Sequence, residues 1–79
     1  MKTLKVNDKV IYRGRWGHDK PKQTTIESIE LCKAEGEKYG TPIDSMTSRN
    51  YRKCVLSLAD NHWCYGYQVD FADSVKLNN

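Results

Sequence analysis

The stretch YRKCVLSLADNHWCYGYQV, residues 51–69, carries the clearest structural signal in the chain. Two runs rich in aliphatic and aromatic residues, Tyr51–Ala59 and His62–Val69, flank the pair Asp60-Asn61. Asn and Asp tolerate the positive φ angles that a two-residue hairpin turn requires. The stretch therefore predicts an antiparallel β hairpin in which Ala59 lies opposite His62.

The register of this hairpin predicts which side chains share a face, because side chains alternate along a strand. We expect one face to carry Cys54, Leu56, Leu58, Trp63, Tyr65 and Tyr67. The opposite face then carries Val55, Ser57, His62, Cys64 and Gly66. A half-buried sheet needs one bulky face, so the aromatic side chains are predicted to point into the core. Trp63 and Tyr67 lie near the strand ends and are expected to be partly exposed.

The segment before the hairpin predicts two further strands. Lys9–Arg13 is the first and Thr24–Cys32 is the second, since both are rich in β-branched residues. Ile26 and Ile29 are three residues apart, which breaks the alternation and predicts a β bulge near Glu27-Ser28. Both isoleucines are expected to join the core.

The rest of the chain carries weaker signals. Residues 33–50 are polar, with a short strand expected at Ile43–Thr47 and a helical turn considered at Cys32–Lys38. After the hairpin, Val69-Asp70-Phe71 predicts a tight turn and Ser74–Leu77 a short closing strand. Five or six short strands with almost no helical periodicity predict an all-β fold in a single domain, residues 1–79. We expect a small closed barrel over about residues 4–77, because closure removes exposed sheet edges.

Several of these features together resemble a known architecture. They are the strand within Val6–Tyr12, the long loop after it, the Asp60-Asn61 hairpin and the Val69-Asp70-Phe71 turn. In outline the chain is similar to small Src-homology-three-like barrels of the Tudor and KOW type. The resemblance implies a five- to six-stranded antiparallel barrel with a long first loop and with residues 33–50 as an insertion. The first loop is basic here, whereas peptide-binding Src-homology-three domains have an acidic one, so proline-rich peptides are not expected as ligands.

Positive charge is concentrated near the amino end. The chain has 13 basic and 10 acidic residues, a net charge of +3, and residues 1–23 hold seven of the basic residues against two acidic ones. No apolar run approaches the roughly 20 residues of a membrane span, and the basic start is not followed by the apolar segment of a signal peptide. We therefore expect a cytoplasmic protein without membrane contact.

The cysteines, Cys32, Cys54 and Cys64, are odd in number and form no Cys-x-x-Cys pair. Small secreted domains normally carry an even set of disulfide-forming cysteines. His62 and Cys64 share a strand face and could offer two ligands to a metal, but a zinc site needs three or four. Reduced thiols, no metal and no cofactor are expected.

The segment Arg13–Lys22 combines positive charge with an indole ring. Its candidate ligand-binding residues are Arg13, Arg15, Trp16, His18, Lys20 and Lys22. Arg and Lys contact phosphate oxygens, and an indole offers a stacking platform for a base. Basic and aromatic residues elsewhere add Arg49, Arg52 and Trp63 to the candidates. The pattern predicts an anionic, nucleotide-bearing ligand; the alternative is that Trp16 packs over one end of the barrel.

The sequence contains none of the common catalytic motifs or phosphate-binding glycine motifs. It therefore predicts a non-catalytic module, not an enzyme, that binds single-stranded nucleic acid or a free nucleotide. One alternative is a protein-interaction module, such as a phage-encoded or mobile-element inhibitor of a host protein, with Tyr39, Ile43 and Met46 in the contact. Further alternatives are a homodimeric protein that sequesters a signalling nucleotide to counter host defence, and a purely structural domain.

Overall fold

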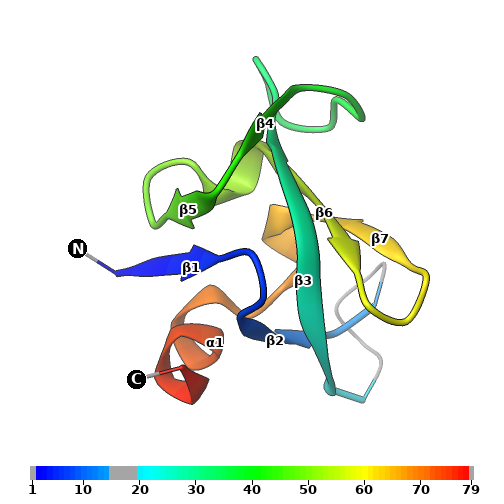
Figure 1. Cartoon of the computed structure of the whole chain (residues 1–79), viewed down its shortest axis with the longest axis vertical. Helices are drawn as coiled ribbons and strands as arrows, with labels where there is room; N and C mark the ends of the chain where they lie inside the picture. Colours follow the sequence, from blue (N-terminus) through cyan, green and yellow to red (C-terminus); the bar gives the residue numbers. More distant parts are fainter. Residues whose placement is uncertain (1, 15–19, 79) are drawn as a thin grey trace.

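The computed structural model describes residues 2–14 and 20–78. Over these residues the chain is mostly β, with seven strands, two 3-10 turns and one short α helix (Figure 1). The strands are β1 (Thr3–Lys5), β2 (Lys9–Tyr12), β3 (Lys22–Leu31), β4 (Thr41–Ile43), β5 (Ser45–Thr47), β6 (Cys54–Leu58) and β7 (Trp63–Tyr65). The helical segments are η1 (Tyr51–Lys53), η2 (Gly66–Gln68) and α1 (Phe71–Leu77).

The strands form two antiparallel sheets. The larger sheet has five strands, in the order β2-β3-β6-β7, with β4 also paired to β3, and the smaller sheet pairs β1 with β5. β3 is the long central strand in Figure 1; its first half pairs with β2 and its second half with β4, while β6 follows its other edge. The described strands do not close into a barrel. Tyr12, at the end of β2, forms an isolated antiparallel bridge with Val69, which follows β7 and η2 in the chain.

The predicted bulge is confirmed in the middle of β3. The register against β6 shifts between Ile26 and Ser28. The extra residue brings Ile26 and Ile29 to the same face although they are three positions apart, and both side chains are buried. A bulge also increases the local bend of a strand, which allows β3 to contact β2 and β4 along one edge.

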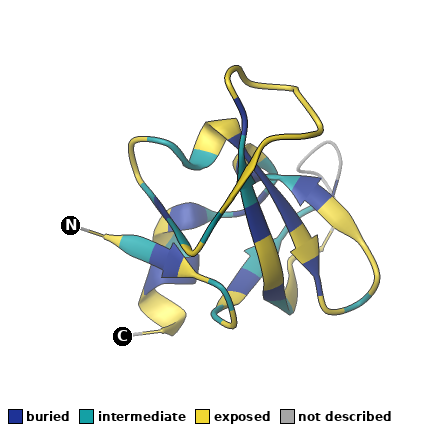
Figure 2. Cartoon of the chain, turned by 45° about the horizontal axis from the view of Figure 1, so that its top comes forward, coloured by how far each residue is buried: buried dark blue, intermediate teal, exposed yellow. Residues whose placement is uncertain are grey.

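The hydrophobic core lies where the two sheets and α1 meet, and Figure 2 shows its buried residues on the inner sides of these elements. Predicted core positions on β2, β3 and β6 are confirmed. The core cluster comprises Leu4, Val10, Ile26, Ile29, Met46, Cys54, Leu56, Leu58, Cys64, Val69, Phe71 and Val75. All the described strands except β4, together with α1, thus contribute at least one side chain to this cluster.

The segment Ser74–Leu77, predicted as a closing strand, is part of the helix α1, so the all-β prediction is wrong at this end. The Asp70 side chain accepts a hydrogen bond from the backbone N–H of Asp73, 3.1 Å away, and so caps the helix. Phe71, Ser74 and Val75 are buried. This i, i+3, i+4 spacing is the helical period, and it outweighs the β preference of a single valine.

A buried polar contact fixes α1 against the sheet. The hydroxyl of Ser74 accepts a hydrogen bond from the backbone N–H of Ile11 in β2, 2.9 Å away. At the end of the helix, the side chain of Asn78 both accepts from the backbone N–H of Lys9 and donates to the Lys9 carbonyl. α1 therefore covers β2 instead of adding a strand beside it.

The polar segment before the hairpin also differs from its prediction. The strand expected at Ile43–Thr47 is divided at Asp44 into β4 and β5, which pair with different partners. The segment Cys32–Lys38 forms turns and bends and contains no helix. Among the described helices, none is long and apolar enough to cross a membrane.

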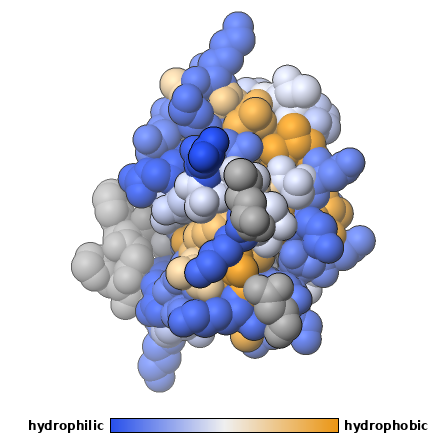
Figure 3. Space-filling model, turned by 90° about the vertical axis from the view of Figure 1, so that its left-hand side faces the viewer, coloured by the Kyte–Doolittle hydropathy of each residue, from blue (hydrophilic) through white to orange (hydrophobic). Residues whose placement is uncertain are grey.

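The face that carries β1, β5 and α1 is covered largely by hydrophilic side chains, with smaller hydrophobic areas between them (Figure 3). Among the described residues, the large hydrophobic side chains that are exposed are Tyr39, Trp63, Tyr67 and Leu77. Leu77 alone of these belongs to α1. The exposed aromatic residues belong to other elements: Tyr39 lies in the segment before β4, Trp63 in β7 and Tyr67 in η2.

Candidate functional site

The turn between β6 and β7 has three residues, Ala59, Asp60 and Asn61, instead of the predicted two. The backbone N–H of Leu58 donates to the His62 carbonyl over 2.8 Å, and that of Asn61 donates to the Leu58 carbonyl over 3.2 Å. Asn61 has a φ of 66°, the left-handed conformation that ends such three-residue turns. The predicted pairing of Ala59 with His62 is therefore wrong by one residue.

This single-residue difference reverses the faces of β7. Ser57 pairs with Trp63 and Leu56 pairs with Cys64. A shift of one residue moves every side chain of a strand to its other face, so Cys64 points into the core while Trp63 is 47% exposed. The aromatic side chains predicted as core instead form an outward surface.

Gly66 explains why the aromatic residues cannot take the inner positions. Its α carbon packs so closely against the backbone carbonyl of Tyr51 that a Cβ at this position would overlap the oxygen. Small residues at 64 and 66 thus face the crowded interior, and the bulky residues at 63, 65 and 67 lie outside.

The outward side chains of Trp63, Tyr65 and Tyr67 form an ordered row, which we call the aromatic row. The rings of Trp63 and Tyr65 meet edge to face with centroids 5.3 Å apart, and those of Tyr65 and Tyr67 are stacked at 5.2 Å with an interplanar angle of 7°. The ammonium group of Lys38 lies 5.1 Å from the centroid of the Trp63 ring. This arrangement places three rings in contact on the surface, with a cation over the ring of Trp63.

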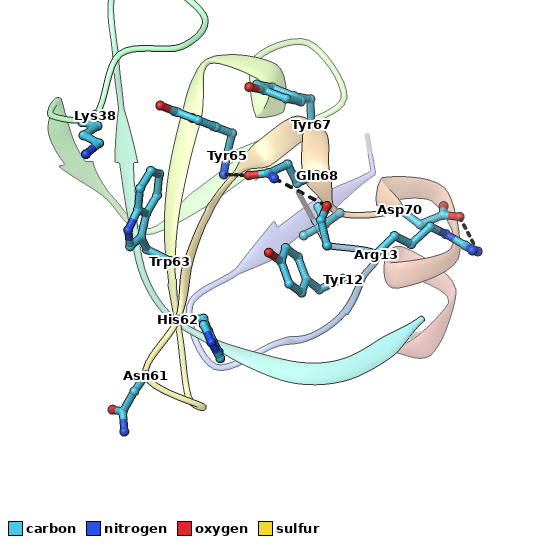
Figure 4. A pocket seen from close by; sticks show the side chains of 12 residues that line it. Tyr12, Arg13, Lys38, Asn61, His62, Trp63, Tyr65, Tyr67, Gln68 and Asp70 are labelled. Atoms are coloured by element: carbon cyan, nitrogen blue, oxygen red, sulfur yellow. Dashed lines mark hydrogen bonds and ion pairs between the residues drawn. The ribbon is translucent and has the colours of Figure 1, made fainter. Parts of the chain in front are cut away.

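The aromatic row forms one wall of a groove with a volume of about 1070 Å³ (Figure 4). The residues that line it are Tyr12, Arg13, Gly14, Lys38, Asn61, His62, Trp63, Tyr65, Tyr67, Gln68, Val69 and Asp70. They come from the end of β2, the segment before β4, the β6–β7 turn, β7, η2 and the start of α1. The volume is slightly above the usual range of small-molecule sites, about 300–1000 Å³.

Hydrogen bonds hold the aromatic row in place. The amide of Gln68 accepts from the backbone N–H of Tyr65 over 2.8 Å and donates to the Gly14 carbonyl over 3.5 Å, which joins η2 to both sides of the groove (Figure 4). The hydroxyl of Tyr65 donates to the Gly36 carbonyl over 3.2 Å. These bonds pre-organise the groove, which reduces the entropy lost when a ligand binds.

Cationic groups lie on two sides of the groove. Lys38 lies beside Trp63, and Arg13, beyond Tyr12 in Figure 4, is 3.5 Å from the carboxylate of Asp70. His62 lines the groove near the turn, with its Nδ1 3.3 Å from Asp60. The lining therefore offers two permanent cations against one carboxylate that is already paired.

Asp60 is the most strongly perturbed carboxyl group next to the groove. The Lys22 ammonium lies 2.8 Å from one of its oxygens, which His62 also approaches. These contacts, that of Lys22 above all, lower the pKa of Asp60 to about 2. The ion pair joins the start of β3 to the β6–β7 turn and so supports the turn that orients the aromatic row.

The structure brings two of the predicted site residues, Arg13 and Trp63, into one groove. Lys22 is instead paired with Asp60, and Lys20 is exposed and does not line the groove. Arg49 is exposed in the turn after β5, and Arg52 in η1 lies 3.3 Å from Glu35, so neither lines the groove. The candidates Arg15, Trp16 and His18 lie outside the described residues.

Sequence reasoning missed several residues of the groove, namely Tyr12, Lys38, Tyr65, Tyr67 and Gln68. The sequence does contain a signal for Tyr65 and Tyr67. The spacing Trp-x-Tyr-x-Tyr places three rings on the same face of a strand, whether that face points inward or outward. The small residues between them marked the inner face. The residues around Lys38 do not predict its place in the groove, because its partner Trp63 is 25 positions away in the sequence.

The thiols take no part in the groove. Cys32, Cys54 and Cys64 are free and buried. Burial raises the pKa of Cys64 to about 12 and that of Cys54 to about 11, and it also raises the pKa of Cys32. Among the described residues, no group of three or more potential metal ligands lies together.

No protein family, characterised protein or solved structure matches this chain when it is compared with them. The groove is therefore interpreted from its own geometry.

Proposed function

We propose that the groove binds single-stranded nucleic acid by stacking a base on the aromatic row, with the adjacent phosphates at Lys38 and Arg13. The observation that supports this most directly is the position of the Lys38 ammonium over the half-exposed ring of Trp63. A ring next to a cation matches the repeating unit of a nucleic acid strand, which alternates a flat base with a charged phosphate.

Stacking supplies one part of the expected affinity. Trp63 is 47% exposed and Tyr67 is 41% exposed, so both rings have surface to offer a ligand. Stacking of a base on an aromatic side chain contributes about 1–3 kcal/mol and tolerates any base. Because hydrogen bonds already orient Tyr65 between them, little of this energy is spent on ordering the row.

The cations supply the contacts to phosphate. Lys38 carries no carboxylate partner among the described ion pairs. The ion pair of Arg13 with Asp70 is 3.5 Å long, and both side chains are partly exposed, so it contributes little and can exchange for a phosphate contact. Two phosphate contacts correspond to a slope of about −1.4 for the logarithm of the binding constant against that of the salt concentration.

We further propose that the larger sheet is a partly closed Src-homology-three-like barrel. The strand order β2-β3-β6-β7 and the bridge between Tyr12 and Val69 support this, because the bridge brings the two ends of the sheet together. Both bridge residues line the groove. The groove would then lie at the seam of the barrel, where the backbone hydrogen bonds of one isolated bridge, from Arg13 to Gln68 and from Asp70 to Ile11, replace a continuous ladder.

The alternative of a protein-contact surface around residues 33–50 receives less support. Met46 is fully buried and Ile43 packs against the core, which leaves Tyr39 as the exposed member of that set. We still propose a cytoplasmic protein that binds a ligand without catalysing a reaction, and the homodimer stays an alternative.

The test is a fluorescence anisotropy titration with a labelled single-stranded oligonucleotide. Trp63→Ala should weaken binding by about 5- to 150-fold, the equivalent of one stacked base, while Leu77→Ala, which removes an exposed hydrophobic side chain from α1, should leave it unchanged. Lys38→Gln should lower the salt slope by about 0.7. Lys5→Gln, which removes the same charge from β1, is the matched control.

Two results would contradict the proposal. One is a binding constant that Trp63→Ala and Leu77→Ala change equally. The other is tight binding to a proline-rich peptide in the same groove with none to the oligonucleotide, which would make the aromatic row a peptide site.

A further inference from the structure

A second, smaller recess lies on the other side of Trp63. It has a volume of about 250 Å³ and is lined by Glu30, Lys38, Tyr39, Val55, Ser57 and Trp63. Lys38 and Trp63 line both the recess and the groove. The recess is smaller than the usual site of a drug-sized ligand, about 300 Å³ or more, and suits a single flat ring.

Neighbouring strands build the floor of the recess. Glu30 pairs with Val55 across β3 and β6, and Ser57 pairs with Trp63 across β6 and β7, so these four side chains stand on one face of the sheet. Tyr39, which is 84% exposed, lines the recess from the segment before β4. A ring on this floor would touch aliphatic and aromatic surface below and a tyrosine at the side.

The polar groups of the recess differ from those of the groove. One carboxylate oxygen of Glu30 accepts a hydrogen bond from the backbone N–H of Gly40, 3.0 Å away, which fixes the carboxylate in the recess. A carboxylate repels phosphate but accepts a hydrogen bond from the exocyclic amino group of a base. The recess therefore favours a base edge, and Lys38, the cation among its lining residues, marks the place for a phosphate.

We propose that the recess binds a second base of the same nucleic acid strand, one that carries an amino group. This inference rests on the proposed function. The phosphate that links the two nucleotides then lies at Lys38, between the groove and the recess. An oligonucleotide of at least two residues therefore binds more tightly than a mononucleotide, and cytosine or adenine is preferred to thymine in the recess.

The test compares three deoxyribonucleotides by isothermal titration calorimetry: deoxycytidine monophosphate, the deoxycytidine dinucleotide and the thymidine dinucleotide. With the unmodified chain, the deoxycytidine dinucleotide should bind at least about fivefold more tightly than the monophosphate, the lower bound for one more stacked base. Tyr39→Ala should remove this advantage and leave the affinity for the monophosphate unchanged. Tyr39→Phe, which keeps the ring, should retain it.

A second variant tests the base preference. Glu30→Gln should abolish the preference for the deoxycytidine over the thymidine dinucleotide, because an amide both donates and accepts. If the monophosphate and the dinucleotide bind equally and Trp63→Ala weakens both, the proposal that the recess binds a base is wrong, while the proposed function of the groove still holds. Absence of binding by all three ligands would overturn the proposed function together with the recess.

Discussion

Leu56 and Cys64 lie directly opposite each other in the antiparallel hairpin of β6 and β7, and both side chains are fully buried. Because side chains alternate along each strand, the adjoining pair, Ser57 and Trp63, stands on the outer face. One pairing therefore determines two properties of the molecule: which residues fill the core and which residues form the aromatic row.

Substitutions in the two faces should separate stability from binding. Leu56→Ala should lower the free energy of unfolding by about 2–5 kcal/mol, since it leaves a cavity in the core. Trp63→Ala should lower it by about 1 kcal/mol or less, because this side chain is half exposed. Urea unfolding followed by circular dichroism measures both, and equal losses would mean that the hairpin register differs from the one described.

Gly66 should be far less replaceable than Gly36. Gly66→Ala would force a Cβ against the Tyr51 carbonyl, and we expect a loss of at least about 3 kcal/mol or failure to fold. Gly36 has a φ of +87° but open space around it, so Gly36→Ala should cost about 1 kcal/mol. Thermal unfolding of the two variants provides the comparison, and a mild effect at Gly66 would contradict the close packing of η1 against η2.

The contacts of Asp60 predict a loss of stability in acid. Lys22, with His62, lowers the pKa of Asp60 to about 2 in the folded chain, whereas an unfolded aspartate titrates near 3.9. The contribution is thus complete above about pH 4 and disappears as the pH falls towards about 2. Since Lys22 is largely exposed, we expect no more than about 1 kcal/mol.

The variant Asp60→Asn isolates this effect. The free energy of unfolding, measured across the acid range by urea titration, should fall less steeply in Asp60→Asn than in the unmodified chain. If the two curves run parallel between about pH 4 and pH 2, the Lys22–Asp60 pair makes no contribution to stability.

The thiols should resist alkylation in the folded protein. At mildly alkaline pH almost no thiolate forms at Cys64 or Cys54, whose pKa values lie near 12 and 11 because the side chains are buried. Mass spectrometry after iodoacetamide treatment should find these two residues unmodified in the native state and all three cysteines modified after denaturation. Rapid native labelling of Cys64 would contradict its place in the core.

Much of the fold follows from short-range patterns. The β-branched residues of β2 and β3 and the three-residue spacing of Ile26 and Ile29 predict two strands and a bulge, and both are confirmed. The hairpin of β6 and β7 is likewise predicted from its two hydrophobic runs. These features depend on alternation and turn chemistry, which neighbouring residues express directly.

The remaining features depend on contacts between residues that are far apart in the sequence. Two- and three-residue turns at Asp60-Asn61 differ by one position, and the packing of Gly66 against Tyr51 favours the three-residue turn. Residues 71–77 form a helix because Asp70 caps it and because Phe71 and its helical neighbours reach the core. Short segments of this kind are decided by tertiary contacts.

The groove was the least predictable part. Its walls combine the end of β2, the segment before β4 and the η2 turn, which are far apart in sequence. A basic cluster was predicted from adjacent residues, whereas the cations that reach the groove, Arg13 and Lys38, are 25 positions apart in the sequence. Residues 15–19, which contain the other candidates, lie outside the described residues.

The most direct test of the central claim follows the indole N–H signals of the chain by ¹H–¹⁵N NMR. The two tryptophans give two such signals, and the one that disappears in Trp63→Phe belongs to Trp63. On addition of a short cytidine oligonucleotide, stacking should shift the Trp63 signal upfield, while the backbone amides of Leu56 and Cys64 stay in place. A Trp63 signal that does not move at saturating oligonucleotide would contradict binding at the aromatic row.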